Sequence, residues 1–160
     1  MSSRPARRSR FAAPSLEPAL AAAAGLSLAA GYVHLAYMQS HWHEWWAYGV
    51  FFLATGVGQV LFAPVALRWP RPWVFVTGLF GNLAIAAMYF VTRTQGAPLG
   101  PHAHAIEPAG AIDLATTAAE LAIVVIMLAA LGPRTRTWVV NALVVSGVLL
   151  WAARLTGHVA

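Results

Sequence analysis

The sequence contains no cysteine and no lysine, and charged residues make up only 9% of its 160 positions. The absence of cysteine excludes disulfides, thiolate metal sites and cysteine nucleophiles. Soluble domains usually carry about 25% charged residues, so this shortfall indicates that lipid surrounds most of the chain. A P-loop, a G-x-S-x-G motif and an H-E-x-x-H motif are also missing, so none of these signatures assigns an enzymatic activity.

The basic residues of the chain are all arginines, ten against five acids, for a net charge of +5. Proteins that bind nucleic acids gather basic residues on one polar face. Here the arginines lie singly or in short groups between apolar runs, as in the cytoplasmic loops of membrane proteins. The charge pattern therefore predicts contact with a lipid bilayer and no nucleic-acid partner.

Hydrophobic residues make up 59% of the chain, and five stretches approach or exceed the roughly 20 apolar residues that cross a bilayer. They cover residues 18–38, 46–67, 72–92, 110–131 and 137–157. The first stretch is longer than the core of a signal peptide, which favours a retained helix. We predict an all-α integral membrane bundle over residues 17–160, preceded by a disordered basic cytoplasmic tail over residues 1–16.

The arginines also predict an orientation, because cytoplasmic loops are enriched in Lys and Arg. If the N-terminus lies inside, eight of the ten arginines are cytoplasmic, and only Arg93 and Arg154 lie outside. The prediction is a multi-pass protein of a bacterial cytoplasmic (inner) membrane with its C-terminus outside. Homo-oligomers and larger membrane complexes stay open as partners.

This orientation assigns all six histidines to the extracytoplasmic side, two pairs of them as H-x-H in outer loops. Imidazole with thioether suits copper, and imidazole with carboxylate suits zinc, copper or iron. We therefore predict a metal site, with copper first and zinc second. Its ligands would come from His34, His41, His43, His102, His104, Glu44, Glu107 and Asp113.

Two other interpretations of the histidines remain open. Haem b is the weaker metal alternative, because His34 is the only histidine well inside a span and a buried haem needs axial ligands from the helices. The histidines can also belong to an interfacial belt with Trp42, Trp45 and Trp46, since such rings favour the headgroup region. For His158, close to the end of the chain, we favour a solvated side chain.

Polar residues inside the spans are costly and mark function or tight pairing. Asp113, Thr116, Thr117 and Glu120 share one face of the fourth span, and Glu120 lies about halfway through it. One interpretation is a polar track for protons or an ion. The other, slightly favoured, is that Glu120 is hydrogen-bonded to Gln59 or Asn82 and holds the bundle together.

Two further features concern packing and pairing. Arg93 caps the third span, where it can pair with Asp113, Glu107 or Glu44. Small residues allow helices in membranes to approach closely. Five glycines in the second and third spans therefore predict close packing: Gly49, Gly56, Gly58, Gly78 and Gly81.

Several short motifs between residues 30 and 130 resemble those of a group of small bacterial polytopic membrane proteins. They include Glu44-Trp-Trp46, Tyr48-Gly-Val-Phe-Phe52, Thr92-Arg-Thr94 and Gly96-Ala-Pro-Leu-Gly-Pro101, together with His34, Gln59, Asn82, Glu107 and Asp113. That group has no assigned activity, so the resemblance implies a membrane fold and no particular function.

Four functions remain in competition. The leading hypothesis is metal binding, transfer or redox chemistry at the His-rich side. A membrane oxygenase or oxidoreductase subunit would need an apolar pocket beside the histidines. A proton- or ion-coupled transporter would use Asp113 and Glu120, and a structural subunit of a larger complex would need neither.

Overall fold

The computed structural model describes residues 16–156, which form five helices. They are α1 (Leu16–Glu44), α2 (Trp46–Arg68), α3 (Pro72–Thr94), α4 (Ala111–Ala130) and α5 (Pro133–Leu155). All five are long and apolar enough to span a membrane, as predicted. Apart from Leu16, the predicted basic tail lies outside the described residues, as does His158.

Local sequence determines where the helices begin. Pro72 and Pro133 stand in the first turns of α3 and α5, where a missing backbone N–H costs nothing. Pro133 therefore starts α5 four residues before the predicted span. At the start of α4, the Asp113 carboxylate accepts a hydrogen bond from the Gly110 N–H at 3.1 Å, which satisfies a backbone donor at the helix start.

The main difference from the prediction concerns the end of α1. The expected span stopped at residue 38, but the helix continues to Glu44, because no glycine or proline interrupts the chain between Gly31 and Gly49. Only Trp45, in extended conformation, separates α1 from α2. His41 and His43 therefore lie on a helix and not in an extended loop.

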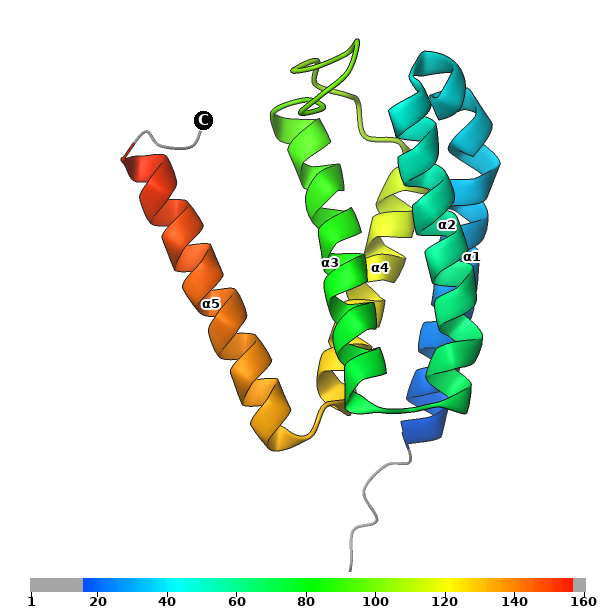
Figure 1. Ribbon diagram of the computed structural model, residues 1–160, viewed down its shortest axis with the longest axis vertical. Coiled ribbons are helices and arrows are strands. Elements are labelled where there is room, and N and C mark those ends of the chain that lie inside the picture. Colours follow the sequence, from blue (N-terminus) through cyan, green and yellow to red (C-terminus); the bar gives the residue numbers. More distant parts are fainter. Residues whose placement is uncertain (1–15, 157–160) are drawn as a thin grey trace, which may run out of the picture.

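Four of the helices form one bundle, and α5 stands apart from it (Figure 1). Within the bundle α1 packs along α2, α3 along α4, and α1 against α4, whereas α2 and α3 meet over a shorter stretch. Val139 is the one residue of α5 that is buried among those described. The fifth helix thus presents almost its whole surface outwards.

The connections divide the bundle into two ends (Figure 1). The turns between α2 and α3 and between α4 and α5 lie at one end, which we call the turn end. The α1–α2 turn and the α3–α4 connection, residues 95–110, lie at the other, which we call the roof end. The apolar core lies towards the turn end and contains Leu20, Leu79, Ile123, Met127 and Leu131.

Candidate functional site

A cavity of about 360 Å³ lies between α1, α2, α3 and α4 in the half of the bundle nearest the roof end. Residues 95–110 contribute Ala97, Pro98, Leu99 and Glu107 to its wall. Most of the remaining lining is apolar or aromatic. The aromatic side chains are Tyr37, Trp45, Tyr48, Phe51, Phe52 and Tyr89. A pocket of this size and lining is typical of small-molecule sites.

The deep end of the cavity carries a buried pair, His34 of α1 and Glu120 of α4. His34 Nε2 lies 3.0 Å from Glu120 Oε1, and the two residues are 8% and 1% exposed. The His34 ring also meets the edge of Phe52, with ring centroids 5.5 Å apart. The most costly acid in the sequence thus has a histidine partner, which was not predicted.

The pair belongs to a polar network that joins all four bundle helices. Gln59 Nε2 of α2 donates to Asn82 Oδ1 of α3 at 3.1 Å, and more weakly to Glu120 Oε1 at 3.4 Å. Asn82 in turn donates to the Gly78 carbonyl at 2.8 Å. The predicted contact between Glu120 and Gln59 is therefore present, and Asn82 is linked to Glu120 through Gln59.

Two residues that line the cavity each have a buried atom without a hydrogen-bond partner within the described residues: His34 Nδ1 and Arg93 Nε. Because Nε2 of His34 is engaged by Glu120, Nδ1 is the ring atom whose hydrogen-bonding capacity stays unused within the described residues. Leaving a buried polar atom unpaired is costly. A ligand with a hydrogen-bonding group would remove that cost at His34.

The His34–Glu120 pair can also move a proton. Either a protonated Glu120 donates to a neutral imidazole, or the imidazole Nε2–H donates to a carboxylate. Both forms keep one hydrogen bond between the residues, and the proton can move between Glu120 Oε1 and His34 Nε2 within it. Chemically, the arrangement is suited to general acid–base exchange with a bound molecule.

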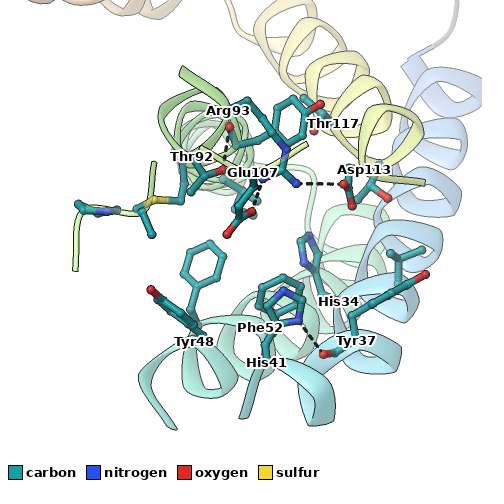
Figure 2. A pocket seen from close by; sticks show the side chains of 18 of the residues that line it. His34, Tyr37, His41, Tyr48, Phe52, Thr92, Arg93, Glu107, Asp113 and Thr117 are labelled. Carbon is teal, nitrogen blue, oxygen red and sulfur yellow. Dashed lines mark hydrogen bonds and ion pairs between the residues drawn. The ribbon is translucent and has the colours of Figure 1, made fainter. Parts of the chain in front are cut away.

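The roof of the cavity is fastened by Arg93 at the end of α3 (Figure 2). Its guanidinium pairs with Glu107 of residues 95–110, which we call the roof segment. It also pairs with Asp113 Oδ2 of α4 at 3.0 Å. It also lies 4.9 Å from the Tyr89 ring centroid. Arg93 therefore pairs with two of the three acids proposed for it, and both are thereby used to hold the roof.

Tyr48 provides a second attachment for the roof. Its hydroxyl donates to the Leu99 carbonyl at 2.7 Å. The neighbouring Gly100 has φ of +100°, and a methyl group at this position would lie 2.6 Å from the Tyr48 hydroxyl. Only glycine allows the segment to adopt this backbone conformation so close to α2.

The predicted metal ligands are spread over several different environments. His34 is engaged by Glu120, and Glu107 and Asp113 by Arg93. His41 donates from Nδ1 to the Tyr37 carbonyl at 2.9 Å and stacks on Phe52. His43 and Glu44 are exposed on the last turn of α1, and His102 and His104 are exposed in the roof segment.

Some of these ligands do share a surface. His41, Glu44, His102 and Glu107 line a polar hollow beside Arg93 at the roof end. Among residues 16–156, however, no three His, Asp or Glu side chains are grouped so that they could hold a metal ion. The copper or zinc site stays a prediction that this arrangement does not support.

These features define an all-helical protein with five helices of membrane-spanning type and a cavity enclosed by four of them. Comparisons of the chain with protein-family models, curated proteins and solved structures find no match.

Proposed function

We propose that this membrane protein binds a small, largely apolar molecule in the cavity, and that the His34–Glu120 pair holds the polar group of that molecule and exchanges a proton with it. The observation that carries the proposal is an apolar cavity ending on a buried histidine whose Nδ1 has no partner among the described residues. Ligand sites combine a mostly apolar lining with a few polar groups that orient the ligand. An ionisable residue at membrane depth is itself a functional candidate.

The composition of the core favours ligand binding over the transport of protons or ions through the bundle. Below the network of His34, Glu120, Gln59 and Asn82, the Ser27 hydroxyl donates to the Gln59 carbonyl. The hydrophobic core cluster beyond it consists of apolar side chains such as Leu79 and Ile123. A proton- or ion-coupled transporter would need polar groups that continue towards the turn end. A purely structural role accounts for the hydrogen bonds among Gln59, Asn82 and Glu120, but not for the cavity beside them.

The orientation of the proposed membrane protein follows from its arginines. Arg68, Arg71, Arg134 and Arg136 lie in or beside the connections of the turn end. Because cytoplasmic loops are enriched in such residues, we infer that the turn end faces the cytoplasm and the roof end faces outwards. We propose a bacterial cytoplasmic membrane as the location, with the cavity in the half of the bundle nearest the outer side.

A pair of aromatic probes tests the proposed function. In phosphatidylcholine nanodiscs we expect 1-naphthol to bind roughly fivefold to tenfold more tightly than naphthalene, because one hydrogen bond contributes about 1–1.5 kcal/mol. Equilibrium dialysis against protein-free nanodiscs of the same lipid corrects for partitioning. His34→Phe should abolish the preference and retain naphthalene binding, whereas His43→Phe, at an exposed position of α1, should change neither.

Two results would refute the proposal. One is equal binding of the two probes to the wild-type protein, and the other is a preference for naphthol that survives His34→Phe. A damaged cavity would lose both probes together, so loss of naphthol alone distinguishes a missing hydrogen bond from misfolding.

The metal site is a separate proposal with its own measurement. The hollow lined by His41, Glu44, His102 and Glu107 is the place where it would lie. Elemental mass spectrometry of the purified protein after copper or zinc loading should give near-stoichiometric metal that His41→Ala/His102→Ala removes. An optical spectrum of the same sample tests for haem. Metal far below one equivalent in the wild-type protein would end the proposal.

A further inference from the structure

We propose that the ligand enters the cavity sideways from the lipid phase, between α2 and α3, and is therefore a bilayer-dissolved molecule with one polar end and an apolar tail. This inference rests on the proposed function, because it requires that the cavity binds a molecule. It adds the route and the chemical class: a long-chain alcohol or a similar lipid, with its polar end at His34 and its tail between the two helices.

The contact between α2 and α3 closes only part of their length. Towards the turn end, a methyl group added at Gly78 of α3 would lie 2.3 Å from Phe62 Cζ of α2, so the phenyl ring rests directly on the glycine. One level higher, Gln59 donates to Asn82. These two contacts join the helices below the cavity.

Above that level α2 and α3 line the cavity from opposite sides. Phe51 and Phe52 face it from α2, and Ile85, Met88 and Tyr89 face it from α3. All five residues are only partly buried, although they line the cavity. Figure 1 shows α2 and α3 side by side, with α4 behind them. Because the two helices meet over a short stretch only, we call their boundary above Gln59 the α2–α3 seam.

The aqueous end offers a narrower and more polar approach. The roof segment is held down by the pairs of Arg93 with Glu107 and Asp113, and by the bond from Tyr48 to Leu99. The polar hollow shares His41, Arg93 and Glu107 with the cavity, so it is the competing entrance from water. A molecule entering there would pass charged groups, whereas the seam offers apolar and aromatic side chains throughout.

The volume of the cavity is a second reason to place the apolar tail of the ligand in the seam. A cavity of about 360 Å³ is at the small end of ligand sites. The polar end of an amphipathic lipid fits beside His34, but a long chain needs a way out. Along the seam, the tail would remain in lipid and its removal from the bilayer would not oppose binding.

Photolabelling in a membrane tests this route. The protein is reconstituted in phosphatidylcholine vesicles that contain a long-chain alcohol with a diazirine beside its hydroxyl, irradiated, and digested for peptide mapping. We expect label on the peptide that contains His34. Met88→Trp, which fills the seam from α3, should lower that label at least fivefold. Val125→Trp, at an exposed position of α4, should leave it unchanged.

The outcomes separate the two proposals. Equal labelling of the His34 peptide in all three proteins would overturn the seam and leave cavity binding intact, with entry through the polar hollow. Absence of label on this peptide in the wild-type protein, while α5 is labelled, would overturn cavity binding and the seam together. Because Met88 also lines the cavity, the fall in label and the fall in naphthol binding are compared within this variant. A fall in label at least fivefold larger than the fall in naphthol binding supports the seam, and equal falls overturn it. Phe51→Trp narrows the seam from α2 and is judged by the same comparison.

Discussion

The residues of the buried network at the deep end of the cavity have different roles. Glu120 is the acceptor on which His34 and Gln59 converge, and Gln59 passes the connection on to Asn82. Because the surroundings are apolar, each hydrogen bond also fixes the position of its two helices. In the proposed site His34 is the residue that would meet a ligand, and the others hold it in place.

Replacing Gln59 by leucine should destabilise the protein without removing the cavity. The change removes the bonds to Asn82 and Glu120, and interhelical hydrogen bonds in membranes contribute roughly 0.6–2 kcal/mol. Thermal unfolding in detergent should therefore occur several degrees lower. Asn141→Leu, the matched change at an exposed position of α5, should leave the transition unchanged. A transition that is the same in both variants would contradict the structural role of Gln59.

The sequence predicts part of this buried network, and the misplaced end of the first span explains the part that it misses. Glu120 stands out because an acid in a span is costly, and Gln59 is a partner at matching depth. His34 is missed as its partner because the first span was ended at residue 38. Counted from the true ends, His34 lies ten residues before Glu44 and Glu120 nine after Ala111, so both are about 14–15 Å from the roof end.

At the level of helices, α1 and α2 are held together through glycines. A methyl group at Gly49 would lie 2.8 Å from Trp42 Cα, and one at Gly56 would lie 3.0 Å from the Gly31 carbonyl oxygen. Close backbone approach of this kind is the usual basis of helix pairing in membranes. Of the five glycines predicted to allow it, Gly58 and Gly81 have no neighbour within 4 Å of the added methyl, because they lie away from the contacts.

Gly49→Ala and Gly58→Ala should have opposite effects on stability. The methyl at Gly49 would overlap Trp42 backbone and side-chain atoms, and overpacking of this kind costs about 1–3 kcal/mol. The methyl at Gly58 meets open space, so the better helix propensity of alanine should stabilise the protein by up to about 1 kcal/mol. Thermal unfolding of the two variants measures the difference. Equal destabilisation would mean that α1 and α2 do not pack as described.

The roof segment should become more mobile when the ion pairs of Arg93, which we call the Arg93 clamp, are removed. Arg93→Gln abolishes the pairs with Glu107 and Asp113, each worth about 1 kcal/mol or less because the acids are partly exposed. Limited proteolysis within residues 95–110 should become roughly fivefold to tenfold faster, since it follows the population of locally opened molecules. Arg154→Gln, at an exposed position of α5, is the control. Unchanged cleavage in Arg93→Gln would refute the clamp.

Helices and roof differ in how far the sequence predicts them. Long apolar runs and flanking prolines predict α2, α3 and α4 to within two residues at each end. The roof depends on backbone conformations that periodicity does not report, such as φ of +64° at His104. The sequence assigns Trp45 to an interfacial belt and does not predict that it shares a cavity wall with other aromatic residues, because a cavity depends on which helix faces meet.

For the molecule as a whole, the arginines predict its direction in the membrane. A periplasm-active reporter such as alkaline phosphatase, fused after Ala160, should be active. The same reporter inserted in the α4–α5 turn, after Gly132, should be inactive, because arginines there keep the turn inside. The reverse result would place the roof end and its histidines in the cytoplasm.

The fifth helix differs from the other four in the amino-acid replacements that it should tolerate. Arg136 donates to the carbonyls of Leu128, Ala129 and Leu131 and so fastens the start of α5 to the end of α4. Beyond that point almost every side chain of α5 is free of the bundle. We therefore expect α5 to tolerate exchanges among apolar residues that preserve its length and hydropathy, whereas exchanges in the four-helix part change the lining of the cavity.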